Sequence, residues 1–224
     1  MAGKTTKFQG TKFYIGTGVE EQKNITACNV KPNATITVAT VASNGFKAGD
    51  AITITGLGSL DGTYPIKSVD NGSPGVITLA DEVDWTAQDK PTVFTQAKVA
   101  RVKWSDNFCA IKNIERSEDT LTEEDVTTMC DEGTVTEPGE IEFGSTKLTF
   151  YAKPSTAMQS LLRKKFFAKE SFPYKLIFTN NQGTMYGTGF VQSGNNYSGE
   201  VKGKFESGAT IKHTKRDYHL PVTG

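Results

Sequence analysis

The sequence predicts a mainly β protein with a single amphipathic helix. Glycine accounts for 22 of its 224 residues, and Asn-Gly or Asp-Gly pairs separate short segments in which apolar and polar residues alternate. Alternation with a period of two indicates strands that are buried on one face, and these dipeptides favour the tight turns of β-hairpins. A helical period is convincing only over residues 154–168. Because no run of about 18 apolar residues is present, we expect no membrane span.

Composition excludes several classes of protein. The 25 basic and 25 acidic residues give a formal net charge of zero, whereas a general binder of nucleic acid or anionic membranes needs a basic surface. The basic N-terminus lacks the apolar stretch of a secretory signal. Cys28, Cys109 and Cys130 are odd in number and irregularly spaced. We therefore expect reduced thiols and a cytosolic folding compartment.

Three segments are predicted along the chain. Residues 1–23 contain a short strand between Gly10 and Gly16, residues 24–100 form a small all-β module, and residues 101–224 form the main β domain. Turn signals 8–12 residues apart in the second segment are typical of a small barrel or sandwich. Its predicted strands are Ala34–Ala42, Ala51–Thr55, Thr63–Val69 and Gly75–Leu79.

The main domain is predicted to combine further strands with the helix. The strands are Phe108–Ile114, Glu140–Tyr151, Tyr174–Thr179, Met185–Gln192, Tyr197–Phe205 and Ala209–Thr214. The helix is Pro154–Ala168, since proline begins it and Ser155 or Thr156 can cap it. Its apolar stripe comprises Met158, Leu161, Leu162 and Phe166.

Charge is segregated within the main domain. Residues 115–142 hold eleven acidic side chains and one basic side chain, Arg116, whereas residues 143–224 hold four acidic and twelve basic ones. A subunit that stacks on copies of itself can place an acidic arm of one copy against a basic face of the next. The alternative for the arm is a solvated, mobile loop.

Candidate contact residues follow from this segregation. The acidic arm carries Glu118, Asp119, Glu123, Glu124, Asp125, Asp131 and Glu132. The candidate basic face carries Arg163, Lys164, Lys165 and Lys169 at the end of the predicted helix, where an ordinary solvated helix face is equally compatible with the pattern.

The order of these motifs resembles a known family. The motifs are Phe13-Tyr14-Ile15-Gly16, Ile111-Lys112-Asn113-Ile114, Asp125-Val126-Thr127-Thr128, the helix Pro154–Ala168 and Tyr174-Lys175-Leu176-Ile177-Phe178. In this order they resemble the major tail tube protein of long-tailed bacteriophages, over residues 8–18 and about 105–215. The resemblance implies a β-sandwich or barrel with one flanking helix and a long hairpin arm.

The same resemblance implies a function. Six copies would form a ring, and stacked rings would form a hollow tube in the virion tail that conducts DNA without binding it specifically. Partners would be other copies, the tape measure, terminator and baseplate proteins, and a sheath where the tail has one. Assembly would take place in the host cytoplasm. The acidic arm would contact a neighbouring subunit or line the lumen and repel DNA phosphates. Tube proteins of this family often lack a piece like residues 24–100, and we expect it on the outer surface because six copies would obstruct the lumen.

The sequence is also compatible with two other functions. A tail terminator or baseplate-hub ring of similar fold is one alternative, and a cell-surface glycan-binding module in residues 24–100 is another. We expect no enzyme, cofactor or metal site. The chain lacks a nucleophile-elbow pattern, and its two histidines, His213 and His219, are not spaced with the cysteines as metal ligands. The carboxylates Glu118 and Glu123 lack an apolar pocket to separate their pKa values.

Overall fold

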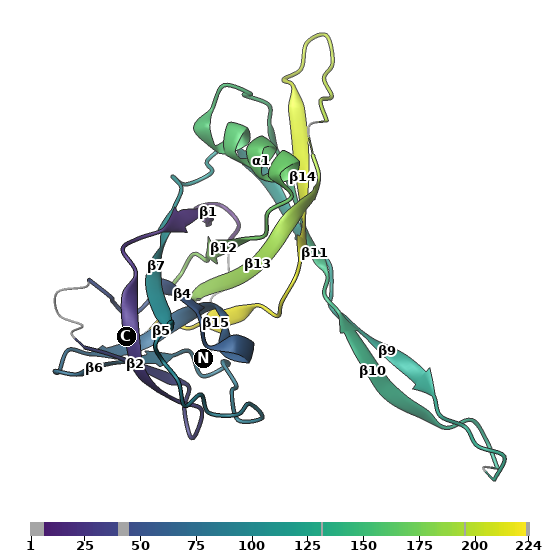
Figure 1. The fold of residues 1–224 in the computed structure, drawn as a ribbon. Helices are drawn as coiled ribbons and strands as arrows, with labels where there is room; N and C mark the ends of the chain where they lie inside the picture. The colour runs from purple at the N-terminus through teal and green to yellow at the C-terminus, as the bar shows by residue number, and fades with distance from the viewer. Residues whose placement is uncertain (1–6, 40–44, 131, 195, 223–224) are drawn as a thin grey trace. The chain divides into compact units, whose positions relative to one another are not determined.

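The computed structural model describes residues 7–39, 45–130, 132–194 and 196–222 (Figure 1). The chain divides into two compact units. The first comprises Met1–Cys109, Phe172–Thr188 and Asp217–Gly224, and the second comprises Ala110–Ser171 and Gly189–Arg216. The prediction of a mainly β chain with an α-helix is confirmed.

Six antiparallel strands of the first unit close into a barrel. Their order around it is β2 (Lys23–Asn29), β3 (Thr35–Val38), β6 (Gly75–Leu79), β5 (Gly62–Asp70), β4 (Ala51–Thr55) and β7 (Lys98–Trp104). The pairing of Lys23 with Val99 joins β2 to β7 and completes the ring. Closure gives every one of these strands a partner on both sides, so the barrel has no open edge.

The barrel interior explains the alternation seen in its strands. Each strand points isoleucine or valine inward and polar residues outward. The fully buried inward side chains are Ile25, Ile36, Ile52, Ile54, Ile66, Ile77 and Val99. The predicted strands Ala51–Thr55 and Gly75–Leu79 match β4 and β6, and Thr63–Val69 lies within β5. The predicted Ala34–Ala42 is too long, because β3 ends at Val38, and residues 40–42 lie outside the described part.

The first unit also contains β1 (Lys12–Val19), β12 (Phe172–Ile177) and β15 (Tyr218–Leu220). β1 pairs with β7 on one side and β12 on the other, and Phe13 stacks on Tyr174 with ring centroids 5.8 Å apart. The predicted strand between Gly10 and Gly16 therefore exists but runs three residues further.

The second unit is a sheet covered by a helix. Its strands are, in order, the part of β13 (Thr184–Ser193) from Gly189 onward, β14 (Glu206–His213), β11 (Ser145–Tyr151) and β8 (Ile111–Arg116). On one face, the buried residues are Thr146, Leu148, Phe150, Ser207, Ala209, Ile211 and His213. The helix α1 (Ala157–Ala168) lies over this face (Figure 1). Leu162 and Phe166 of the helix line a small cavity together with Phe150 and Ala209 of the sheet.

The helix begins later than predicted. Thr156 is its N-cap, but the Thr156 hydroxyl donates to the carbonyl of Lys153 and caps no helical N–H. Gln159 secures the entry instead: its Oε1 accepts from Lys153 N at 2.8 Å, and its Nε2 donates to the Tyr151 carbonyl at 2.8 Å. Of the predicted stripe, Met158 and Leu162 are buried and the other two members are half-buried.

Two predictions for the main domain are wrong in part or entirely. Glu140–Tyr151 is two strands, β10 (Thr136–Glu142) and β11, because the chain breaks at Phe143-Gly144. Tyr197–Phe205 is no strand, although its residues alternate. It is a connection with a turn in which Gly203 N bonds to the carbonyl of Glu200, and a single bridge joins Ser198 to Glu206.

The remaining strand predictions shift at their ends. Phe108–Ile114 becomes β8, which begins at Ile111 because Cys109 and Ala110 form a turn. Tyr174–Thr179, Met185–Gln192 and Ala209–Thr214 correspond to β12, β13 and β14 with boundaries moved by one to three residues.

Candidate assembly surface: the arm, its anchor and the basic helix face

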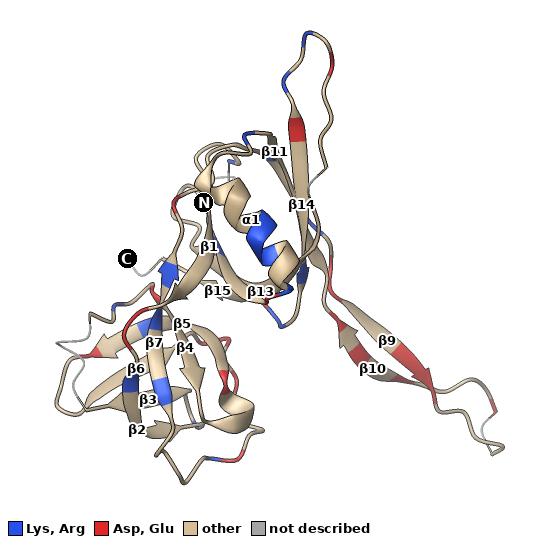
Figure 2. Ribbon diagram, turned by 45° about the horizontal axis from the view of Figure 1, so that its top comes forward, with Lys and Arg blue, Asp and Glu red and all other residues tan. Residues whose placement is uncertain are grey.

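The acidic segment folds into a two-stranded hairpin, which we call the arm. β9 (Thr120–Asp125) pairs antiparallel with β10, from Thr136 opposite Asp125 to Glu142 opposite Thr120. Every residue of β9 is exposed to solvent. Figures 1 and 2 show the hairpin extending away from α1, and the ribbon of Figure 2 marks acidic residues on both of its strands. The predicted acidic arm is therefore an ordered hairpin in this structure.

The register gives the arm two chemically different faces. Directly opposite residues share a face, and successive residues alternate. The first, which we call the mixed face, carries Leu121, Glu123, Asp125, Thr136, Pro138 and Ile141; the second, the acidic face, carries Thr120, Thr122, Glu124, Glu137 and Glu142. A bulge between Pro138 and Ile141 keeps both of these residues on the mixed face.

Neither face supplies the arm with a core of its own. On the mixed face, Leu121 and Ile141 pair but stay 55% and 59% exposed. On the acidic face, Glu124 lies directly opposite Glu137, and like charges opposite one another are destabilising. A two-stranded hairpin is marginal in water without further packing. The arm therefore depends on its attachment to the sheet and on whatever covers it.

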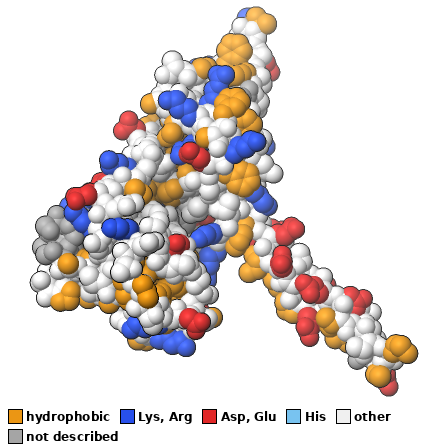
Figure 3. Space-filling view, in the orientation of Figure 1, with side chains coloured by type: hydrophobic (Ala, Val, Ile, Leu, Met, Phe, Trp, Pro, Cys, Tyr) orange, Lys and Arg blue, Asp and Glu red, His pale blue; other side chains and the backbone are white. Residues whose placement is uncertain are grey.

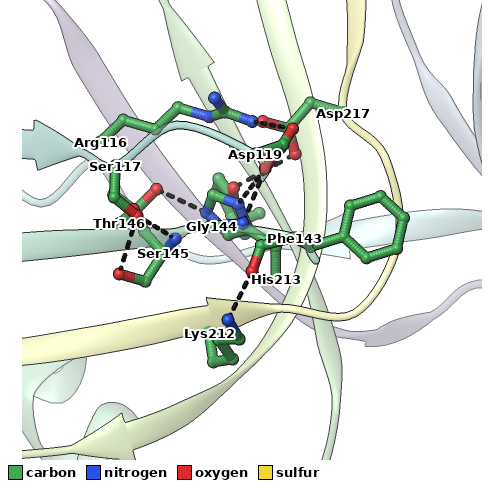
Figure 4. A network of polar contacts seen from close by, with 11 residues as sticks. Arg116, Ser117, Asp119, Phe143, Gly144, Ser145, Thr146, Lys212, His213 and Asp217 are labelled. Carbon is green, nitrogen blue, oxygen red and sulfur yellow. Dashed lines mark hydrogen bonds and ion pairs between the residues drawn. The ribbon is translucent and has the colours of Figure 1, made fainter. Parts of the chain in front are cut away.

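The attachment is a hydrogen-bond network between the two ends of the hairpin (Figure 4). Asp119 Oδ1 accepts from Gly144 N at 2.7 Å. Ser117 N donates to the Ser145 carbonyl at 2.9 Å, and Ser145 N donates to Ser117 Oγ at 2.7 Å. A Cβ at Gly144 would lie 2.4 Å from the carbonyl oxygen of Ser117, so only glycine fits there. We call Ser117, Asp119, Gly144 and Ser145 the anchor.

Residues of β14 form further hydrogen bonds to the anchor and to the adjacent Phe143. His213 N donates to the Gly144 carbonyl at 3.1 Å, and Lys212 Nζ donates to the carbonyl of Phe143. The buried His213 ring places Nε2 2.8 Å from Thr146 Oγ1 and Nδ1 4.0 Å from Asp119 Oδ1. These contacts fix the base of the arm on the β11–β14 sheet, which argues against a loosely attached loop.

The contacts of Asp119 at the anchor change the pKa of its carboxyl group. Burial raises its pKa, but the hydrogen bonds from Gly144 N and Arg116 and the nearby charges of Arg116 and His213 outweigh it, so the pKa lies below the ordinary value. Asp119 is therefore ionised at neutral pH. The pKa of Asp125 is lowered by hydrogen bonds from the Thr127 hydroxyl and N–H.

The tip of the arm combines acidic and apolar side chains. Val126 N donates to the Val135 carbonyl at 2.9 Å, so pairing continues past β9. Val126, Met129 and Val135 are all exposed there. Glu132 is exposed, whereas Asp131 lies outside the described residues. Figure 3 shows apolar and acidic side chains side by side along the arm.

The structure separates the four basic residues proposed as a contact face. Arg163 and Lys164 are exposed on α1, and the Arg163 guanidinium lies 5.8 Å from the ring centroid of Phe167, which is 65% exposed. Lys165 pairs with Glu170 at 2.7 Å, and its side chain is only 17% exposed. Lys169 is the exposed C-cap residue with φ +54°. We call Arg163, Lys164 and Phe167 the helix patch.

β8 forms the end of the strand order in the second unit. Across the described residues its hydrogen-bonded neighbour is β11 alone, so its other edge offers backbone donors and acceptors. The sheet face opposite α1 is polar, with Lys112, Lys147, Thr149 and Thr210 on it. Lys112 pairs with Glu206. An open edge beside a wet face suits pairing with another chain.

Sequence reasoning identified the acidic and basic residues. It named Asp119 as a contact or lumen residue, whereas the structure places Asp119 in the anchor; the other anchor residues and the exposed Phe167 were not predicted. A glycine two residues after Glu142, the last carboxylate of the acidic segment, was the available signal for Gly144. Phe167 follows Phe166, yet only one of two adjacent helical residues can face the sheet, which was a signal for an exposed ring.

No helix in the described ranges is both long and apolar enough to span a membrane. Within the same ranges, no group of three or more His, Cys, Asp or Glu side chains could hold a metal ion.

No protein-family model and no curated protein matches the chain. Similar solved structures include the virion of a native gene transfer agent particle, with 17% identity over 51% of this chain and 88% of the other, at a TM-score of 0.42. The SPP1 tail tube has 15% identity over 63% of this chain and 74% of the other, at a TM-score of 0.42. The tail of an empty gene transfer agent particle, with C6 symmetry, has 17% identity, coverages of 51% and 85%, and a TM-score of 0.42.

Proposed function

We propose that this chain is the structural subunit of a phage-type tail tube, which assembles into hexameric rings that stack into a hollow tube for DNA delivery. The main support for this proposal is the arm. It is an anchored, solvent-exposed hairpin with acidic and apolar side chains and without a core of its own. A monomer gains nothing from such an element, whereas a neighbouring copy can cover it. The subunit would assemble in the host cytoplasm and reside in the virion tail.

Two features support contact between copies. The open edge of β8 can accept a strand or edge from an adjacent subunit, which would extend the sheet by main-chain hydrogen bonds. The helix patch presents positive charge, while residues 115–142 carry a formal charge of −10 from eleven acidic side chains and one basic one. Edge pairing would hold a ring together, and opposite charges would favour the stacking of one ring on the next.

The polar face of the second unit is suited to a water-filled lumen. Lysines and glutamates are interspersed on this face with threonines, so a DNA backbone passing along it would meet no continuous basic track to bind. The placement of residues 24–100 on the outside of a tube stays a prediction. The same holds for contacts with tape measure, terminator, baseplate and sheath proteins.

Negative-stain electron microscopy of the purified chain at high concentration, with light scattering for mass, tests the proposal. Tubes or six-fold rings with an open centre are expected. Rings that never stack would favour the terminator or hub alternative. Monomers that stay dispersed at all concentrations, and also when fragments of pre-formed tube are added as seeds, would contradict the tube function.

A further inference from the structure

We propose that the mixed face of the arm, and not its acidic face, docks on the helix patch of a second copy, with Leu121 and Ile141 against Phe167 and Glu123 against Arg163. The inference rests on the proposed self-assembly and names the two surfaces that meet. It follows from what the arm and α1 each leave exposed.

The arm exposes the apolar part of this contact. Leu121 and Ile141 are directly opposite one another across the hairpin and are more than half exposed. They form a continuous apolar spot with acidic side chains beside it, because Glu123 is the next residue on the same face and Asp125 the one after. Covering this spot with an apolar partner stabilises the complex, because apolar surface is removed from water.

The helix patch exposes the complementary arrangement. Phe167 and Arg163 are four residues apart on α1 and therefore lie on one side of the helix. The Arg163 guanidinium lies over the Phe167 ring. In the described part of the chain, no carboxylate pairs with Arg163 or Lys164, in contrast to Lys165, which pairs with Glu170. The patch thus has an apolar surface with two available cations beside it.

The spacings of the two surfaces agree. Residues i and i+2 of a strand are about 6.8 Å apart, which is the separation of Leu121 from Glu123 along β9. Residues i and i+4 of a helix are about 6 Å apart along the axis, which is the separation of Arg163 from Phe167. The apolar spot and the first carboxylate can therefore reach the ring and the guanidinium together.

The occupant of the patch is another copy because the arm and the helix leave β11 at opposite ends. The arm returns to the sheet at Ser145, where β11 begins, and α1 follows Tyr151, where β11 ends. Figures 1 and 2 both show the hairpin pointing away from α1. The arm of one copy can therefore meet only the helix patch of a different copy.

The test compares two variants that change the same net charge on opposite faces of the full-length arm. Glu123→Lys with Asp125→Lys alters the mixed face, and Glu124→Lys with Glu137→Lys alters the acidic face. The critical concentration for assembly, measured by light scattering, is expected to rise about tenfold or more for the first pair and less than about threefold for the second. Equal effects of the two pairs would overturn the docking.

A charge swap gives a second readout. Glu123→Arg alone and Arg163→Glu alone should each impair assembly, and the double variant should restore a critical concentration within about threefold of the original. Failure of the double variant to recover, with each single variant impaired and folded, would count against this pairing.

Cross-linking separates failure of the docking from failure of the proposed function. Leu121→Cys and Phe167→Cys are combined in a chain that also carries Cys109→Ser and Cys130→Ser, since Cys109 and Cys130 are exposed. Oxidation is expected to join 121 of one copy to 167 of another, as read by peptide mass spectrometry. Tubes without this cross-link would refute the docking and leave the tube function standing. The cross-link in dimers of a chain that forms no rings or tubes would support the docking and refute the tube function.

Discussion

The backbone N–H of Gly144 donates a 2.7 Å hydrogen bond to Oδ1 of Asp119, and this bond joins the two ends of the arm. Asp119 directly precedes β9, and a single residue, Phe143, separates Gly144 from the end of β10. The contact therefore determines how the hairpin leaves the sheet. An arm fixed in direction loses less conformational entropy when a partner covers it.

Replacement of Gly144 by alanine should release the arm. The added Cβ would lie 2.4 Å and 2.5 Å from the carbonyl oxygens of Ser117 and Glu118, so the backbone must move and the Asp119 bond is lost. We expect a cost of about 1–3 kcal/mol confined to the second unit. A dye on Cys130 in a Cys109→Ser chain should then show lower fluorescence anisotropy.

Gly133→Ala is the matched control, because nothing lies within 4 Å of a Cβ built at this tip residue. Unchanged anisotropy is expected for that variant. If Gly144→Ala also left the anisotropy unchanged, the anchor would not be what orders the arm.

Acid should loosen the arm through Asp119. The pKa of this carboxyl is below its ordinary value in the folded chain, so its ionised form stabilises the anchor at neutral pH. The contribution is present above the unfolded pKa of about 3.9 and is lost as pH falls through the lower, folded value. Anisotropy of the dye on Cys130 should therefore drop below about pH 3.9.

Two variants assign that transition. Asp119→Asn should remove the acid transition and leave a weaker anchor at all pH values, since it cannot attract Arg116 by charge. Asp125→Asn, at the other end of β9, should keep the transition. A transition that survives in Asp119→Asn would have to be attributed to another group.

Four of the six barrel strands were predicted from the sequence because their information is local, whereas β2 and β7, whose pairing closes the barrel, were not predicted. Asn-Gly and Asp-Gly turns and alternating apolar residues defined β4 and β6 to the residue. The same signal failed at Tyr197–Phe205, where alternation occurs without a partner strand and Gly199 and Gly203 favour turns. Periodicity reports a possible strand, but pairing decides whether it forms.

The anchor and the two faces of the arm were not predictable in this way. Ser117, Gly144 and His213 are 27 to 96 residues apart in the chain, and their local sequences do not show which residues are in contact. The division of the arm into faces depends on a bulge between Pro138 and Ile141, which shifts the register of β10. The charge pattern therefore predicted an arm but not how its side chains divide between two faces.

Assembly should weaken with salt if charge favours stacking. The Debye length falls from more than 10 Å at 0.05 M to a few Å at about 0.5 M, so attraction between the arm and the helix patch is screened. We expect the critical concentration to rise over this range. Assembly that is insensitive to salt would leave edge pairing by β8 as the main contact.

Lys164 and Lys165 should respond differently to reversal. Lys164→Glu places a negative charge on the exposed patch, so it should raise the critical concentration without lowering the melting temperature. Lys165→Glu breaks the pair with Glu170 and should mainly destabilise the second unit. A chain that carries both Lys164→Glu and Lys165→Glu should stack poorly. Normal tube yield from Lys164→Glu, measured by sedimentation, would remove this residue from the interface.

Gln159 should be the side chain on which the position of α1 depends most. Gln159 is 9% exposed, and its amide bonds to the backbone of Tyr151, the last residue of β11, and of Lys153 in the connection to the helix. Gln159→Leu fills a similar volume but leaves both backbone groups without these bonds. Each buried backbone group left unsatisfied costs about 1–3 kcal/mol, so the melting temperature of the second unit should fall by several degrees.

Two comparison variants separate the amide's donor from its acceptor. Gln159→Glu keeps an acceptor for Lys153 N but places a carboxylate beside the Tyr151 carbonyl, so it should be about as destabilising as Gln159→Leu. Ser160→Ala, at the next helical position, should melt close to the original temperature in calorimetry. A Gln159→Leu chain as stable as the original would show that packing of Met158 and Leu162 alone positions the helix patch.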